Sequence, residues 1–337
     1  YRKEPSVPLR SSSAALYNNL SVLRASGKAP SSFSTVHGPS LSLVTADGSG
    51  FAQRQLQAKE GGSALSTSLF TQAAWCVLPS RVLLVLTSQR GIQMYEADGS
   101  IMVYWHALDV AEHLPAPDLF SAQAVFARGI ATAAGHFICV GTSLGSVLVF
   151  DIPPKGTNVT LSEVLEQHHA PITDIAAEQG QAPDGAGDLV TADDDGTLCL
   201  WRTGEEFALL GRIADVGCSC PSVKLWNGIV AAGYGNGQIR LYEAASGALR
   251  AQINAHARWI NALDLAPETG KLLSGAEDSF VHVWQLSRNP ETYDIEVQHC
   301  QSESVTDIQV CGARFCDPRG TSFAVTGYDL SEIFRYS

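Results

Sequence analysis

The chain has 337 residues, of which 45% are hydrophobic and 17% charged, and its 34 acidic against 22 basic residues give a formal net charge of −12. This balance disfavours a surface that follows nucleic-acid phosphates, because such a surface needs clustered lysine and arginine. The sequence has no run of about 18 apolar residues and does not open with a basic segment followed by an apolar one, so we expect neither a membrane span nor a signal peptide.

Short β-strand patterns follow one another along the whole chain. Hairpin turns are indicated between them by Asp98-Gly99, Asp195-Gly196 and Asn236-Gly237, since these pairs tolerate positive φ angles. No segment sustains the 3.6-residue period of an amphipathic helix. The sequence therefore predicts an all-β protein that is nearly free of helix.

A repeated unit organises these strands. Seven hairpins end in an aromatic or large apolar residue, at Val44, Tyr95, Phe150, Trp201, Tyr242, Trp284 and Tyr336. The spacings are 41 to 55 residues, against about 40–45 for one four-stranded propeller blade, and the excess is expected in loops. A single blade cannot bury both of its apolar faces, so the repeats must stack. We predict a seven-bladed β-propeller of four-stranded antiparallel blades, with residues 1–337 as one domain.

The first residues of the chain are expected to complete the last blade. The third strand of the seventh unit ends at Tyr336, one residue before Ser337, so that unit lacks an outer strand. The segment Ser6–Leu9 precedes the first complete unit, and its proline is acceptable on an edge strand. We predict that this N-terminal strand closes the ring and removes a free sheet edge.

Two of the repeats carry a nearly complete WD-repeat signature. One copy has His256, Ser274, Asp278 and Trp284, and the other has His169, Thr191, Asp195 and Trp201. In both sets the aspartate lies six residues before the tryptophan and the hydroxyl residue ten before it. In composition the sets resemble a catalytic triad. In WD repeats, however, these side chains form a buried hydrogen-bond chain, which leaves no hydroxyl free to attack a substrate.

Three other local patterns favour structure over chemistry. Gly233–Gly237 lacks the GxGxxG spacing and a following helix, so a hairpin turn is favoured over a nucleotide site. The run Asp193–Asp195 fails the spacing of a calcium loop. The cysteine pairs Cys218/Cys220 and Cys311/Cys316 lack zinc-knuckle spacing and could bind zinc only by converging in space. We expect no metal, no cofactor and no catalytic residue.

Longer strings point to one family. They include Arg81–Glu96 (RVLLVLTSQRGIQMYE), Gly135–Thr142 (GHFICVGT), Ala231–Gln238 (AAGYGNGQ) and Cys311–Asp317 (CGARFCD). Through these and shorter strings, nearly the whole chain resembles the vertebrate family of WD repeat-containing protein 54. The resemblance implies an intracellular, non-enzymatic propeller without family active-site residues.

The expected function is that of a protein-protein interaction scaffold whose partner is a cytosolic or vesicle- or membrane-associated protein. A homo-oligomeric adaptor or coat component, and an enzyme that uses the central channel, are the alternatives. The eight cysteines do not have the density of a disulfide scaffold, which fits a reducing compartment. We expect a cytoplasmic location that includes peripheral attachment to vesicles or membranes.

A partner surface is predicted on one face of the disc. In WD propellers the residues just before an inner strand, and the residue before the turn aspartate, point to that face. The pattern selects Arg258, Trp259, Glu277, Asp194, Tyr234 and Tyr328. Trp and Arg are frequent energetic anchors of interfaces, which places Arg258 and Trp259 at the centre of the hypothesis. The alternative is that Trp259 packs over a loop of its own blade.

Overall fold

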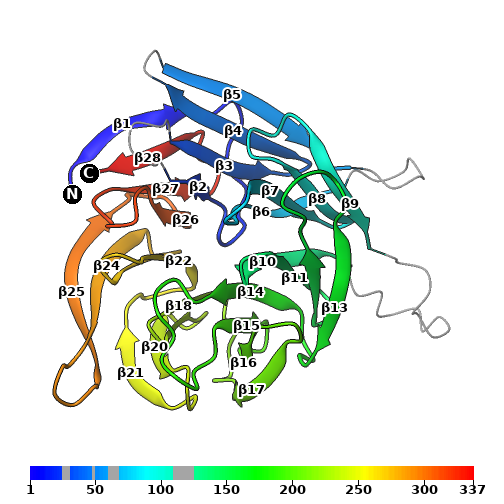
Figure 1. Ribbon diagram of the computed structural model, residues 1–337. Coiled ribbons are helices and arrows are strands. Elements are labelled where there is room, and N and C mark those ends of the chain that lie inside the picture. The colour runs from blue at the N-terminus through cyan, green and yellow to red at the C-terminus, as the bar shows by residue number, and fades with distance from the viewer. Residues whose placement is uncertain (25–30, 48–49, 60–67, 109–124) are drawn as a thin grey trace, which may run out of the picture.

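The computed structural model describes residues 1–24, 31–47, 50–59, 68–108 and 125–337. All regular structure in these residues is β, without a helix. The strands form seven four-stranded antiparallel sheets, which stand as blades around a common centre (Figure 1). The predicted seven-bladed propeller is confirmed.

Six blades are each made of four strands that are consecutive in the chain and run in order from the innermost to the outermost. The first three are β2 (Ser21–Leu23), β3 (Ser32–His37), β4 (Ser40–Asp47), β5 (Gly50–Gln57); β6 (Phe70–Val77), β7 (Val82–Ser88), β8 (Gly91–Glu96), β9 (Met102–Ala107); and β10 (Ala127–Ala133), β11 (Phe137–Thr142), β12 (Ser146–Asp151), β13 (Thr160–Glu166). The next three are β14 (Ile172–Ala177), β15 (Leu189–Asp193), β16 (Leu198–Arg202), β17 (Ala208–Ile213); β18 (Ser222–Trp226), β19 (Ile229–Gly233), β20 (Gln238–Glu243), β21 (Leu249–Asn254); and β22 (Ile260–Ala266), β23 (Lys271–Ala276), β24 (Phe280–Arg288), β25 (Ile295–Ser304).

The seventh blade joins the two ends of the chain. Its strands are β26 (Val310–Phe315), β27 (Phe323–Gly327), β28 (Glu332–Tyr336) and, outermost, β1 (Lys3–Pro8). β1 pairs antiparallel with β28, from Lys3 opposite Tyr336 to Pro8 opposite Glu332. The two termini therefore lie side by side (Figure 1). The predicted ring closure is confirmed, with a strand that begins three residues earlier than Ser6 and ends before Leu9.

Apolar side chains between neighbouring blades form the core. All seven residues of β22 are buried, whereas the outer strand β17 has five of six residues exposed or half-buried. The difference arises because inner strands are covered by a blade on each side and outer strands lie at the rim. The repeat anchors Phe150 and Trp201 lie in third strands and are buried between blades, each contributing about 1.5–3 kcal/mol of apolar burial.

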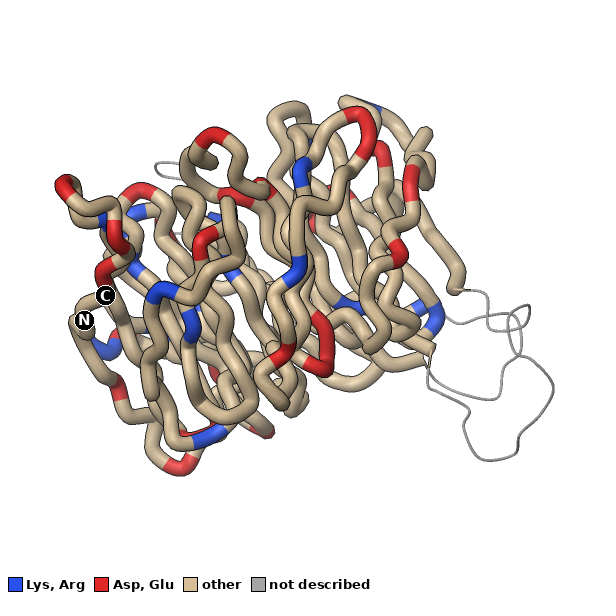
Figure 2. The backbone as a smooth tube through the Cα atoms, turned by 90° about the horizontal axis from the view of Figure 1, so that it is seen from below, with Lys and Arg blue, Asp and Glu red and all other residues tan. Residues whose placement is uncertain are grey.

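The two faces of the disc are made by different loops. One face carries the connections between blades and the turns between second and third strands; the other carries the remaining turns. Seen edge-on, the strands run between these two faces, and many acidic residues lie in the loops (Figure 2). Gly237 shows why some of these turns need glycine: its φ is +84°, and a Cβ atom there would lie 2.1 Å from the carbonyl oxygen of His256.

Candidate protein-interaction face

The blade β22–β25 contains a buried chain of hydrogen bonds. Nδ1 of His256 lies 3.1 Å from both carboxylate oxygens of Asp278, and its Nε2 lies 2.8 Å from Oγ of Ser274. Nε1 of Trp284 donates to the same hydroxyl at 3.0 Å. Burial alone would raise the pKa of Asp278, but hydrogen bonds from His256 and from the backbone amide of Ala257 hold it below its usual value. The structure thus brings these four residues of the sequence pattern together.

The blade β14–β17 contains an equivalent chain, but with two different residues from those predicted. Nδ1 of His168 lies 2.8 Å from Oδ2 of Asp193, its Nε2 lies 2.7 Å from Oγ1 of Thr191, and Nε1 of Trp201 donates to Thr191 at 3.0 Å. The prediction of His169 and Asp195 for these roles was wrong. Both are exposed.

The distance to the inner strand could have identified the correct histidine. His168 lies four residues before Ile172, the first residue of β14, as His256 lies four before Ile260 in β22. The aspartate gave no such signal. Asp193 is the residue that faces Ile172 across the sheet and corresponds in register to Ala276, so its carboxylate enters the blade two residues earlier than that of Asp278.

These polar side chains are structural parts of the blades. Thr191 and Ser274 are both fully buried, and each hydroxyl lies between a histidine and a tryptophan. A substrate would have no access to either oxygen. Within the part of the chain that the structure describes, no group of three or more His, Cys, Asp and Glu side chains is placed to hold a metal ion.

A repeated backbone hydrogen bond fixes the turns of one face. The amide of Glu277 donates to the carbonyl of Trp259, Asp194 donates to Pro171, and Tyr328 donates to Gln309. Each bond joins the turn between second and third strands to the residues just before the inner strand. It therefore sets which side chains this face presents, and we call it the turn face.

Five of the six predicted partner-binding residues lie on the turn face. Arg258 is exposed, Trp259 and Glu277 are half-buried, Asp194 is exposed, and Tyr328 is 54% exposed. They come from three blades. Figure 1 shows the order of these blades around the ring, from β14–β17 through β18–β21 and β22–β25 to the blade with β26.

Tyr234 does not belong to this surface. It is fully buried, and its hydroxyl lies 2.9 Å from that of Tyr242 inside the blade. In the blade β18–β21 the repeated turn hydrogen bond is made by the amide of Gly235, which donates to Ser219. The surface position is therefore one residue later than predicted, and the residue before it points into the blade.

Trp259 packs on the neighbouring blade. A Cβ atom built on Gly235 would lie 2.6 Å from two carbons of the Trp259 ring, so the indole lies directly on that glycine. Next to it, Oγ of Ser219 donates to Oδ1 of Asp194 at 2.9 Å. The residues form a continuous row on the turn face, from Asp194 through Ser219 and Gly235 to Trp259.

The segment between β1 and β2 crosses the centre of the ring near the turn face, which sequence reasoning did not detect. The side-chain amide of Asn18 donates to the carbonyl of Pro221, and its backbone amide donates to Asn261. The guanidinium carbon of Arg128 lies 3.4 Å from the ring centroid of Tyr17. Pro221, Asn261 and Arg128 belong to three different blades, so this segment covers the channel at that end. It is the blue segment at the centre of Figure 1.

Comparisons with known proteins agree with this architecture. A family model described as WDR54 matches residues 1–337. The chain belongs to the WDR54 family. WD repeat-containing protein 54 from Mus musculus is 64% identical to it and the human protein of the same name 63%, and in both cases the alignment covers 100% of this chain and 99% of the relative.

Solved structures show the fold shared beyond the WDR54 family. One chain of "Crystal Structure of Mitotic Checkpoint Complex" superposes with a TM-score of 0.73 at 15% identity, covering 100% of this chain and 92% of the other. The "WD40 beta propeller domain of Doa1" gives 0.68 at 14% identity, with coverage of 100% and 96%. At these identities the likeness concerns the fold alone. Nowhere in the described residues does a helix reach the length and apolarity needed to cross a membrane.

Proposed function

We propose that this protein is a non-enzymatic scaffold that binds another protein on its turn face, around Arg258 and Trp259. Membership in a WD-repeat propeller family supports the general role, because such propellers typically act as interaction scaffolds. The buried hydrogen-bond chains serve this role indirectly. They fix the turns from which the surface residues project.

The observation that carries the proposal is the state of the Arg258–Trp259 pair. Trp259 is held by Gly235 of the next blade and still has exposed surface, so little conformational entropy is lost when a partner covers it. Arg258 is exposed, and among the described residues none forms a side-chain hydrogen bond or ion pair with it. A rigid aromatic ring beside an uncommitted guanidinium group is the usual composition of an interface anchor.

The charge of the turn face indicates the kind of partner. Exposed carboxylates lie on the turns and blade connections of this face, at Asp194, Asp195, Asp215, Asp307 and Asp329. They are consistent with the formal net charge of −12. A partner segment with basic residues around an apolar contact would complement the surface and associate faster at low ionic strength.

A cytoplasmic location, including attachment to a vesicle- or membrane-associated partner, is part of the proposal. All eight cysteines are free thiols, as a reducing compartment favours. A homo-oligomeric adaptor is the alternative form of the same idea, in which the partner is a second copy of the chain. Light scattering over a range of concentrations distinguishes the two.

The test is a binding comparison with the whole chain as bait. Proteins recovered from cell extract by the wild type are identified by mass spectrometry, and their affinities are then measured with purified components. We expect the double variant Arg258→Ala, Trp259→Ala to weaken binding by at least about 2 kcal/mol. The melting temperature of each variant is measured alongside, because Trp259 also packs on Gly235.

Tyr293→Ala is the matched control, since Tyr293 is 72% exposed and lies in the β24–β25 turn on the opposite face. It should leave affinity unchanged. If every recovered partner binds the double variant as tightly as the wild type, the interface lies on that opposite face or on the rim, and the proposal fails.

A further inference from the structure

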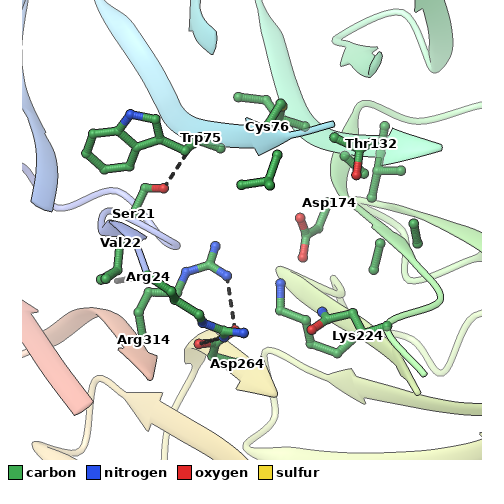
Figure 3. A pocket seen from close by; sticks show the side chains of 18 of the residues that line it. Ser21, Val22, Arg24, Trp75, Cys76, Thr132, Asp174, Lys224, Asp264 and Arg314 are labelled. Atoms are coloured by element: carbon green, nitrogen blue, oxygen red, sulfur yellow. Dashed lines mark hydrogen bonds and ion pairs between the residues drawn. The ribbon is translucent and has the colours of Figure 1, made fainter. Parts of the chain in front are cut away.

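A cavity of about 510 Å³ lies in the central channel, on the side away from the Tyr17–Asn18 crossing. Its walls are the later residues of the inner strands, among them Val77 of β6, Thr132 of β10 and Ala177 of β14. The crossing segment instead contacts the opposite end of the inner strands, at Pro221, the residue before β18, and Asn261, the second residue of β22. The channel thus has one covered end and one hollow end, and Figure 3 shows residues that line the hollow end.

One wall of this cavity carries three cationic side chains from three parts of the fold. Lys224 comes from β18, Arg314 from β26, and Arg24 from the residue after β2. Figure 3 shows all three beside the open space, with the two arginines gathered at Asp264. They are far apart in the sequence, so only the closing of the ring gathers them.

Each of the three cations keeps donors that no described residue accepts. Lys224 is 6% exposed, and among the described residues none lies within hydrogen-bond or ion-pair distance of its ammonium group. Arg314 uses Nε for the carbonyl of Leu20 and Nη1 for Asp264, which leaves Nη2. Arg24 uses Nε and Nη2, which leaves Nη1.

Each carboxylate of the cavity accepts hydrogen bonds from the protein. Asp264 accepts hydrogen bonds from Arg24 at 3.0 Å and from the amide of Phe315 at 2.7 Å. Asp174 accepts from the amide of Val223 at 2.9 Å and from Ser222 at 3.3 Å. Glu178, at the rim, accepts from the amide of Gly228 at 3.0 Å. Both oxygens of Asp264 are therefore committed to the protein, and Asp174 is held through Oδ2, whereas each of the three cations keeps an unused donor.

The opposite wall is uncharged. It is made by residues of β6 and β10, including Val77, Ile130 and Thr132. The cavity consequently has a side with three cations around Asp264 and an uncharged side across from it, with Asp174 between the two (Figure 3). A ligand that fits both would have an anionic group at one end and an uncharged body at the other.

We propose that the central channel is a binding site for a small organic anion, whose phosphate or carboxylate group is held by Lys224, Arg314 and Arg24. The ammonium group contributes a point charge, and the two guanidinium groups contribute directional N–H donors suited to oxyanions. The anion would accept the donors that the protein leaves unused. It would also offset the cost of an unpaired cation in a buried position.

The protonation of Lys224 agrees with this role. Burial, and next the nearby Arg314, lower the pKa of its ammonium group to about 8. The group is still mostly charged at pH 7, and an anion bound beside it would raise the pKa again. The cationic wall is therefore available for binding at neutral pH.

The test uses pyrophosphate and citrate as probes with the full chain. Calorimetric titration at pH 7 and constant ionic strength should show saturable binding of at least one of them, with one site per chain. We expect Lys224→Met to weaken this binding at least tenfold, about 1.4 kcal/mol. Tighter binding of pyrophosphate would assign a phosphate head group to the ligand, and tighter binding of citrate a carboxylate.

Lys155→Met is the matched control, because Lys155 is exposed in the turn between β12 and β13. It should bind both probes like the wild type. The proposal is overturned if neither probe shows saturable binding up to about 10 mM, or if the wild type and Lys224→Met bind with equal affinity.

A second measurement keeps the test decisive if Lys224→Met does not fold. The wild type is acetylated with a small reagent in the presence and absence of pyrophosphate and, separately, citrate, and each lysine is quantified by mass spectrometry. We expect at least one anion to slow the labelling of Lys224 severalfold while Lys155 is unaffected. Equal slowing at both lysines, or none at Lys224 with either anion, contradicts a channel site.

Discussion

The blades β14–β17 and β22–β25 build the same hydrogen-bond chain from different sequence positions. In both, a tryptophan donates to a buried hydroxyl at 3.0 Å, and a histidine joins that hydroxyl to an aspartate. The aspartate lies eight residues before the tryptophan in the first blade and six in the second. The two blades share the position of the carboxylate beside the histidine. They differ in how far along the chain the aspartate lies from the tryptophan.

The two aspartates also differ in their surroundings. The Asp193 side chain is 3% exposed, and its Oδ1 accepts the amides of Asp195 and Thr197, so it holds its own hairpin as well as His168. The Asp278 side chain is 11% exposed. Burial is thus more complete in the first blade, and loss of the carboxylate there should cost more.

Replacing Asp193 should cause the largest loss of stability of the changes considered for these two blades. In Asp193→Ala, the imidazole of His168 and two turn amides lose their acceptor in a position that water hardly reaches, so we expect a loss of about 2–4 kcal/mol in the free energy of unfolding. Chemical denaturation measures this loss. Asp195→Ala is the control: it is exposed and should stay within about 0.5 kcal/mol of the wild type. Equal losses in the two variants would restore Asp195 to the network.

Replacing Asp278 should have an intermediate effect. Asp278→Ala removes the acceptor of His256 and of the amide of Ala257, and we expect a loss of about 1–3 kcal/mol with the fold intact. Thermal melting of this variant is compared with that of Asp184→Ala, which changes an exposed loop residue. If both variants melt at the same temperature, the chain in β22–β25 does not contribute to stability.

In the blade β22–β25, His256 also contacts a cluster of further histidines, and we expect this cluster to make the stability of the blade sensitive to acid. The ring of His282 lies 4.7 Å from that of His256, and its Nδ1 is 3.3 Å from Nε2 of His299 and 2.8 Å from Oγ of Ser302. Burial, and next the charges of His256 and His299, lower the pKa of His282 to about 4. The nearby Asp278 acts in the opposite direction but does not compensate.

The smallest predicted effect is therefore a change in pH dependence. Between pH 6.5 and about 4 the unfolded chain protonates His282 while the folded chain does not, so this residue makes stability fall as the pH falls through that window. In His282→Gln the slope of stability against pH should become shallower there. His169→Gln, at an exposed histidine of the other blade, is the control and should keep the wild-type slope. An unchanged slope in His282→Gln would show that His282 titrates normally.

Much of the architecture could be predicted from the sequence because its signals are local. The turn pairs and the alternating apolar residues specify hairpins, and the recurrence of anchors such as Trp201 and Trp284 specifies blades that must stack. Ring closure followed from an unpaired third strand at one end and a spare strand at the other. The set of His256, Ser274, Asp278 and Trp284 could also be predicted from the sequence, since its spacing matches the repeat.

The tertiary structure decided which residues occupy the places that the pattern allows. Of two adjacent histidines, His168 enters the blade and His169 faces solvent. Of Asp193 and Asp195, the residue opposite the inner strand is the one buried. Tyr234 turns inward for the same reason, because a one-residue shift in register moves a side chain to the opposite side of a strand.

The features of the channel depended on tertiary structure most strongly. Nothing in the sequence around Asn18 indicates that this residue crosses the ring to meet Pro221, and Lys224, Arg314 and Arg24 share no motif or spacing. Local sequence determines strands and turns, because these depend on neighbouring residues. The contents of the channel depend on all seven inner strands at once, and so they exist only after the ring has closed.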